Sequence, residues 1–234
     1  GSFDASSAVL ASNDNKAFAL TLSGKPSAAL NNQKIGTITV TVEKFTGTIA
    51  NDAATLQSAV NAGGYVVLGS DIDLGSSYLN IKSSANALIL DLNGKTLSSS
   101  SSSQTIQILS NVTIQNGTVT NTNKNYVIKN TSTVTIKNCT LTTTNSYPLY
   151  NMGTSATVMD STLSGKSSAN FSICSEAGTV TLGGNMTMDA GLRTYNSAVY
   201  TILPGTYNVD ISSYVDTDNY TVTNNGNIWT VTAK

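Results

Sequence analysis

The stretch VTIQNGTVTN at residues 112–121 decides the fold, because variants of it recur along the chain at a fixed spacing. Three central segments begin 22 residues apart: TIQNGTV at 113–119, TIKNCTL at 135–141 and TVMDSTL at 157–163. Two outer segments fit the same frame: DLNGKTL at 91–97 and TILPGTY at 201–207. A fixed period of this size predicts a solenoid, in which each repeat packs on its neighbours.

Within each repeat, apolar and polar residues alternate, as in the trio Val112, Thr113 and Ile114. This is the period of a half-buried strand. Asn116-Gly117 then supplies residues that tolerate the left-handed backbone of a corner. Three short strands in one repeat predict an all-β, parallel β-helix with about 22 residues per coil and coils about 4.8 Å apart. Equivalent apolar residues should stack into one core ladder: Leu92, Ile114, Ile136, Val158 and Ile202.

The solenoid is predicted over residues 51–234, with a short capping helix before the first coil. Residues 52–62 change to helical spacing, and Asp52 is a suitable N-cap. A helix within 51–63 would cover the open N-terminal end of the core. Residues 1–50 contain two strand-like stretches, and we expect them to pack on the solenoid or to form a small β module.

The C-terminal end of the solenoid is predicted to carry a second cap, over residues 208–234. Apolar residues flank Asn224-Asn225-Gly226, a turn sequence that predicts a β-hairpin within 214–231. The serine run 98–103 is expected to be a loop that bulges from a corner.

Composition and charge limit the partners of the chain. Charged residues make up 11% of it and the formal net charge is −1, so its scattered lysines form no basic patch for nucleic acid. No apolar run approaches the roughly 18 residues of a membrane span. Cys139 and Cys174 differ in phase within the repeat, which predicts two small buried side chains and no disulfide.

Two parts of the solenoid region resemble known proteins. LQSAVNAGGYVVLGSDIDL at 56–74, followed by LILDLNGKTL at 88–97, resembles the opening of bacterial right-handed β-helix proteins of the pectate-lyase-like superfamily. The ending ILPGTYNVDISSYVDTDNYTVTNNGNIWTV at 202–231 is similar to one found in secreted or surface proteins of gut bacteria. The resemblance implies a right-handed β-helix and a secreted or cell-surface location.

Aromatic residues suggest where a ligand could bind. Tyr126, Tyr147 and Tyr150 lie 21 and 24 residues apart, close to one period, so they should line up on one face of adjacent coils. Such a row either packs as amphipathic side chains at the rim of the core or forms a strip that contacts a glycan, since sugars bind on aromatic faces beside polar groups.

Acidic residues suggest a second candidate site. Asp71 and Asp73 alternate with apolar residues and should point outward, and Asp91 should do so one coil later. They are predicted to be solvated side chains, with a calcium site or a catalytic pair as alternatives. Arg193, the one arginine, is expected at the surface, with the role of a catalytic base as its alternative. No catalytic residue is assigned, and calcium is the one candidate cofactor.

The function expected from these features is non-catalytic. The chain should be a secreted or cell-surface, adhesion-like or structural protein that binds an extracellular glycan or another polymer of a host or cell surface. A polysaccharide lyase or glycoside hydrolase is the alternative, because proteins of the resembled superfamily include enzymes that cleave acidic polysaccharides. A tailspike-like recognition domain, which would favour a trimer, is a third.

Overall fold

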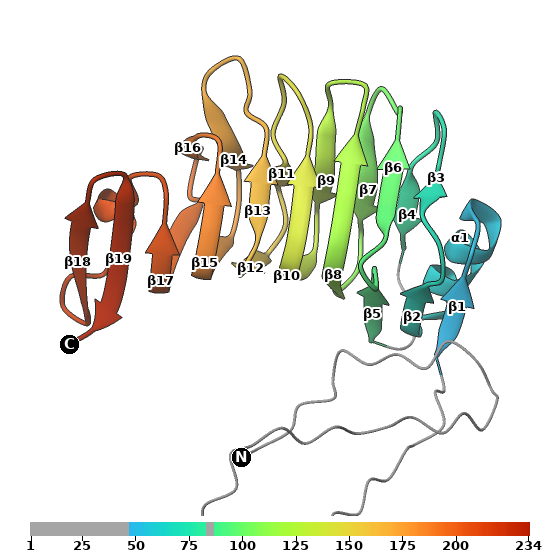
Figure 1. The fold of residues 1–234 in the computed structure, drawn as a ribbon, viewed down its shortest axis with the longest axis horizontal. Coiled ribbons are helices and arrows are strands. Elements are labelled where there is room, and N and C mark those ends of the chain that lie inside the picture. The colour runs from blue at the N-terminus through green and yellow to red at the C-terminus, as the bar shows by residue number, and fades with distance from the viewer. Residues whose placement is uncertain (1–46, 83–86) are drawn as a thin grey trace, which may run out of the picture. The chain divides into compact units, whose positions relative to one another are not determined.

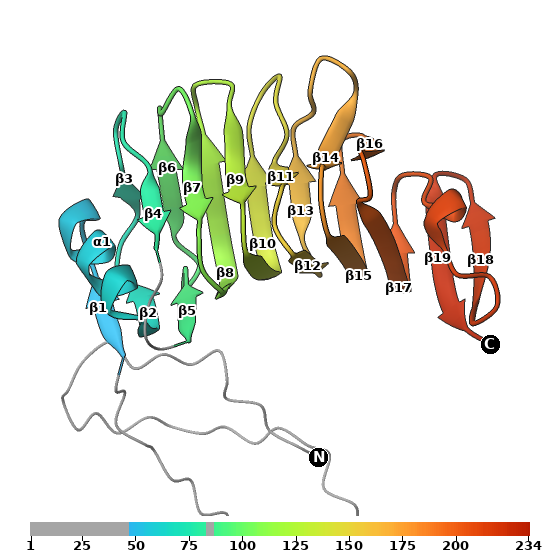
Figure 2. The same ribbon diagram turned by 180° about the vertical axis from the view of Figure 1, so that it is seen from behind.

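The computed structural model describes residues 47–82 and 87–234, which form a parallel β-solenoid of about seven turns. The coils follow one another in chain order along its length, and two sheets form its sides (Figures 1 and 2). The all-β class, the parallel winding and the spacing of about 22 residues are confirmed.

Each coil contributes strands to two sheets. The main path of sheet A runs in the order β1 (Thr48–Ala50), β2 (Gly64–Leu68), β5 (Leu88–Asp91), β8 (Val112–Asn121), β10 (Thr133–Thr142), β12 (Ser155–Met159), β15 (Thr179–Met188), β17 (Val199–Tyr207), β19 (Ile228–Ala233) and β18 (Tyr220–Asn225). Three short strands pair beside this path: β3 (Ile72–Asp73), β6 (Thr96–Ser99) and β13 (Thr162–Ser164). Sheet B runs in the order β16 (Gly191–Thr194), β14 (Phe171–Ser175), β11 (Leu149–Asn151), β9 (Tyr126–Asn130), β7 (Gln104–Ile108) and β4 (Leu79–Ile81).

The central core ladder is confirmed, and its first rung is corrected. Ile114 pairs with Ile136, and Ile136 with Val158, at the predicted spacing. The partner of Ile114 on the preceding coil is Leu90, not Leu92. Leu92 lies past the end of β5, at a corner where Asn93 and Gly94 have φ of 51° and 73°. This corner contains two residues more than the next one, which hides the true register from a count of 22.

The predicted corners are formed by residues in the left-handed region. Asn116, Asn138 and Asp160 have φ of 61°, 52° and 49°. The amide of Asn138 donates to Asn116 Oδ1 at 3.4 Å, and Asp160 Oδ1 accepts from the backbone N–H of Asn185 at 2.9 Å. A short polar side chain therefore turns the strand and links one coil to the next.

Both predicted caps are present in the described residues. Helix α1 (Ala53–Ala62) begins after Asp52, whose carboxylate accepts from the Thr55 N–H at 2.8 Å. At the other end, β19 pairs antiparallel with both β17 and β18, after the short 3-10 helix η1 (Ser212–Tyr214). Strand β1 pairs with β2, so residues 48–50 belong to the solenoid and not to the segment before it. The expected module lies otherwise in residues 1–46, outside the described residues.

The serine run is more ordered than the predicted bulge. Ser98 and Ser99 belong to β6, and Ser99 and Ser101 are buried. Ser99 Oγ donates to the carbonyl of Ser77 at 2.6 Å and accepts from the N–H of Ser101 at 2.9 Å. Serine can enter the wall of the solenoid here because its hydroxyl satisfies backbone groups that the corner leaves unpaired.

One inward row of sheet B changes from apolar to polar along the solenoid. Ile81 and Ile108 occupy it in the first coils, and Asn130, Asn151 and Ser175 occupy it in the following ones. Asn130 Nδ2 donates to Asn151 Oδ1 at 2.7 Å, and Asn151 Nδ2 donates to Ser175 Oγ at 3.0 Å and to the carbonyl of Ala177 at 2.7 Å. These buried amides form a hydrogen-bonded ladder that replaces an apolar one.

Candidate functional site

The outward face of sheet B carries the predicted tyrosines. Strand pairing places six residues in its central outward row: Asn80, Gln107, Lys129, Tyr150, Cys174 and Arg193. The alternate residues of the same strands, from Leu79 to Leu192, point into the core. The period of two along each strand thus separates a polar and aromatic face from the apolar interior.

Tyr126, Tyr147 and Tyr150, which we call the tyrosine cluster, come together as predicted. The ring centroids of Tyr126 and Tyr150 lie 4.5 Å apart at an interplanar angle of 18°. The Tyr147 centroid lies 6.2 Å from that of Tyr126 and 6.1 Å from that of Tyr150, again with nearly parallel rings. The rings therefore stack on one another, which supports rim packing and leaves mainly ring edges and hydroxyls for a ligand.

Two charged side chains hold the hydroxyls of this cluster. Tyr150 donates its hydroxyl proton to Glu176 Oε1 at 2.5 Å, and Arg193 Nη1 donates to the Tyr147 hydroxyl oxygen at 3.2 Å. Burial raises the pKa of Tyr150 above its ordinary value, and the hydrogen bond and negative charge of Glu176 raise it further. Burial also raises the pKa of Tyr126. The phenols are thus held neutral at the pH where sugars are normally bound.

Arg193 extends the cluster toward the C-terminal end of sheet B. Its guanidinium carbon lies 4.2 Å from the ring centroid of Tyr195 and 5.6 Å from that of Phe171. A cation at this distance from an aromatic face is attracted by the ring quadrupole. Arg193 therefore joins Tyr195, which is 38% exposed, to the tyrosine cluster. Sequence reasoning identified neither Phe171, Glu176 nor Tyr195 as part of this face.

The cysteines are buried and free, as predicted. Cys174 lies on the outward row between Tyr150 and Arg193, yet it is covered. Burial is the main cause that raises the pKa of both thiols, that of Cys139 to about 11. A covered thiol with a raised pKa is poorly reactive, so the two cysteines act in packing.

The three aspartates do not converge. In register, Asp73 pairs with Ser98 on the coil that follows it, whereas Asp91 pairs with Val67 on another part of sheet A. Asp71 accepts a hydrogen bond from the N–H of Thr96 at 2.7 Å, and Asp73 accepts one from the N–H of Gly75 at 3.0 Å. Both remain exposed, as predicted.

Asp91 differs from the prediction because it is buried, with an exposed fraction of 2%. Its carboxylate accepts from the Tyr65 hydroxyl at 2.6 Å, from Gln115 Nε2 at 2.8 Å and from Asn116 Nδ2 at 3.1 Å. The N–H of Asn93 is a further donor, at 2.8 Å. Burial and the bonded carboxylate raise the pKa of Tyr65 to about 12. Side chains from the coils on either side thus close over an aspartate that alternation alone places in solvent.

This arrangement does not favour calcium at the predicted aspartates. The oxygens of Asp91 already accept hydrogen bonds, and Asp71 and Asp73 lie elsewhere on the sheet. Across residues 47–82 and 87–234, no three His, Cys, Asp or Glu side chains form a group that could hold a metal ion. Calcium binding stays a prediction, which calorimetric titration of the protein with calcium chloride would test.

Comparisons of the chain with protein-family models, curated proteins and solved structures found no match. The β-solenoid is shown by the structure, while the right-handed winding, the superfamily and the surface location implied by the resemblance stay predictions. Within the described part of the chain, no helix has both the length and the apolar character needed to cross a membrane.

Proposed function

We propose that the protein is a non-catalytic, secreted or cell-surface module, adhesion-like or structural, that binds an extracellular glycan or another cell-surface polymer with the tyrosine cluster. The observation that carries the proposal is the gathering of three tyrosines, Glu176 and Arg193 on the outward face of sheet B. The resemblance of the chain to secreted and surface proteins supports the location.

The chemistry of the cluster suits sugar hydroxyls. A carboxylate accepts hydrogen bonds only, and a guanidinium has five N–H donors, so Glu176 and Arg193 together can bind hydroxyls as acceptor and donor. The half-buried rings beside them supply apolar surface for the C–H groups of a sugar. Because the rings are stacked and their hydroxyls are held, the polar groups lie in fixed positions before a ligand arrives, which lowers the entropy cost of binding.

A glycan array tests the proposal on the full chain. The wild-type protein is expected to bind at least one polysaccharide or oligosaccharide, and Tyr147→Ala and Arg193→Ala should each weaken that binding by about tenfold, the loss expected for one charge-assisted contact. Tyr220→Ala is the matched control, since Tyr220 lies in the C-terminal cap and should not affect binding.

Thermal melting of each variant separates loss of binding from loss of folding. Binding that survives both Tyr147→Ala and Arg193→Ala would remove the cluster as the site. Turnover of a polysaccharide by the wild-type protein would favour the lyase or hydrolase alternative and contradict a non-catalytic role.

A further inference from the structure

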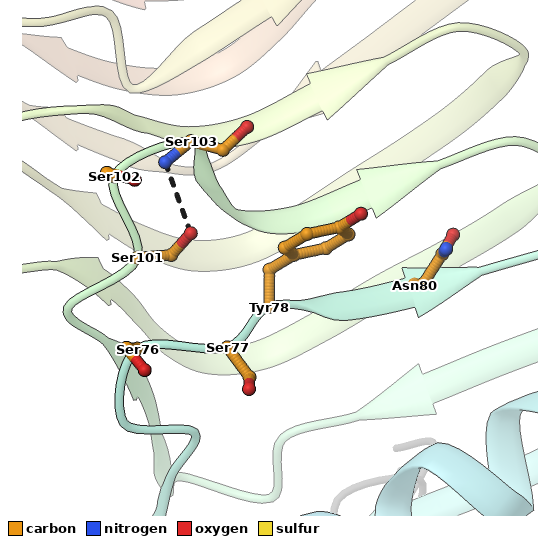
Figure 3. Close-up of a pocket in the computed structure, with 7 residues that line it drawn as sticks. All are labelled: Ser76, Ser77, Tyr78, Asn80, Ser101, Ser102 and Ser103. Carbon is orange, nitrogen blue, oxygen red and sulfur yellow. Dashed lines mark hydrogen bonds between the residues drawn. The ribbon is translucent and has the colours of Figure 1, made fainter.

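A second concave site lies in the first two coils, outside the tyrosine cluster. It has a volume of about 490 Å³ and lies where the chain enters strands β4 and β7 of sheet B (Figure 3). Its lining is uncharged: Ser76, Ser77, Tyr78, Asn80, Ser101, Ser102 and Ser103. The volume falls within the range of small-molecule sites, which runs from about 300 to 1,000 Å³.

Hydrogen bonds between coils fix the serine wall of this pocket. Ser101 Oγ accepts from the N–H of Ser103 at 3.1 Å, the contact drawn in Figure 3. From the next coil, Asn121 Nδ2 donates to the carbonyl of Ser101 at 3.2 Å and Asn125 Nδ2 donates to the carbonyl of Ser102 at 2.6 Å. The wall is therefore held in place from both sides, and the pocket does not depend on a free loop.

Tyr78 offers an aromatic face that no other ring covers in the described part of the chain. Leu79 pairs with Ile106, so the residue one coil beyond Tyr78 is Thr105, which is small and buried. Tyr78 is 40% exposed as a result. Figure 3 shows its ring between the serines of the two coils and Asn80, where it can contact a bound molecule.

The pocket also has hydrogen-bonding capacity that the protein does not use. The hydroxyls of Ser76, Ser77 and Ser102 make no hydrogen bond to described residues. Asn80 Oδ1 is the one buried side-chain polar atom of the described residues that lacks a hydrogen-bond partner. A covered amide without a partner costs free energy, and a small rotation toward the pocket would let a ligand hydroxyl satisfy it.

We propose that this pocket binds one unit of a neutral saccharide, with the sugar ring against Tyr78 and its hydroxyls on the serines and Asn80. The absence of charge in the lining selects a neutral sugar, because a uronate carboxylate would lose water without gaining a cationic partner. The site is separate from the tyrosine cluster, and each can fail while the other stands.

Isothermal titration of the full chain with maltotriose, cellotriose, mannotriose and trigalacturonate tests the proposal. At least one of the neutral trisaccharides should bind at millimolar concentration, and trigalacturonate should bind at least about tenfold more weakly. Tyr78→Ala should weaken the neutral ligand by about tenfold, whereas Tyr78→Phe should keep most of the affinity because the ring remains. Ser102→Leu, which fills part of the pocket at an exposed position, should also weaken binding.

Tyr147→Ala separates this site from the tyrosine cluster. Neutral trisaccharide binding that is lost in Tyr78→Ala and kept in Tyr147→Ala would support the pocket. Binding that is kept in Tyr78→Ala and Ser102→Leu would overturn it, and so would the absence of binding by all three neutral trisaccharides. Equal affinity for trigalacturonate would remove the argument from charge. The exposed positions of Tyr78 and Ser102 let both variants fold, which circular dichroism would verify.

Discussion

The two halves of sheet B use the same strand register for different purposes. In the first coils, Ile81 and Ile108 lie inside and the exposed Tyr78 lies outside, beside a polar pocket. In the later coils, Asn130 and Asn151 occupy the inner row, and stacked tyrosines cover the outer face.

The difference teaches that the neighbour one coil away decides what a tyrosine does. Tyr150 has Tyr126 stacked 4.5 Å away, so its ring face belongs to the protein. Tyr78 has Thr105 one coil further on, so its ring face remains available. In a solenoid with coils about 4.8 Å apart, two rings at equivalent positions stack almost automatically. An isolated ring is therefore the better candidate for flat contact with a sugar, and a stacked one for contact through edges and hydroxyls.

The largest expected effect comes from breaking the inner amide ladder. Asn151→Ala leaves Asn130 Nδ2 short of one acceptor and the carbonyl of Ala177 short of one donor, and should lower the free energy of unfolding by about 3 kcal/mol. Ile108→Val, in the apolar half of the same row, should cost about 1 kcal/mol. Urea unfolding measures both. An equal or smaller cost for Asn151→Ala would show that the ladder contributes no more than ordinary packing.

A smaller effect is expected on the outer face. Tyr150→Ala removes ring stacking and the bond to Glu176, and should lower the free energy of unfolding by about 2 kcal/mol. Tyr78→Ala should lower it by less than about 0.5 kcal/mol, because the ring is exposed and unstacked. For a solenoid of this size, the melting temperatures should fall by about 4–8 °C and by less than about 2 °C. Similar shifts for the two variants would abolish the distinction between stacked and free rings.

The pH dependence of stability gives the smallest effect. Burial, with Glu176, raises the pKa of Tyr150 in the folded state, while an unfolded tyrosine titrates near pH 10. The unfolded state therefore loses its proton first, so the stabilisation is complete below about pH 10 and is lost as the pH rises toward the folded pKa. Tyr65, with a folded pKa of about 12, should lose its contribution between about pH 10 and pH 12.

Urea midpoints at about pH 9 and about pH 11 measure this loss. It should shrink in Tyr150→Phe and in Tyr65→Phe, which have no phenol to titrate at those positions. A loss of the same size in both variants and in the wild type would assign the alkaline destabilisation to other groups.

The fold could be predicted because the repeat is regular where it matters most. Ile114, Ile136 and Val158 keep one spacing and the same type of corner, so their stacking follows from the sequence. The register of Leu92 could not be predicted in this way, because the extra residues of its corner are compensated elsewhere in the count. The interval from Val158 to Leu182 is 24 residues and that from Leu182 to Ile202 is 20, so together they still equal two periods.

The candidate sites could be predicted only in part. The spacing of Tyr126, Tyr147 and Tyr150 predicts that they meet, but ring orientation depends on rotamers that spacing does not determine. Phe171 lies 24 residues after Tyr147, and that interval is a signal that could have added it to the cluster. The burial of Asp91 could not be foreseen, because Tyr65 and Gln115 reach it from other coils.

The central claim is that ligand binds on the outward face of sheet B. Amide chemical-shift mapping of the isotope-labelled chain tests it most directly, with the tightest-binding trisaccharide as the probe. We predict shifts near Tyr78 or Tyr150, with no change in the outward threonine row of sheet A formed by Thr113, Thr135 and Thr157. Shifts confined to that threonine row, with sheet B unchanged, would contradict the account.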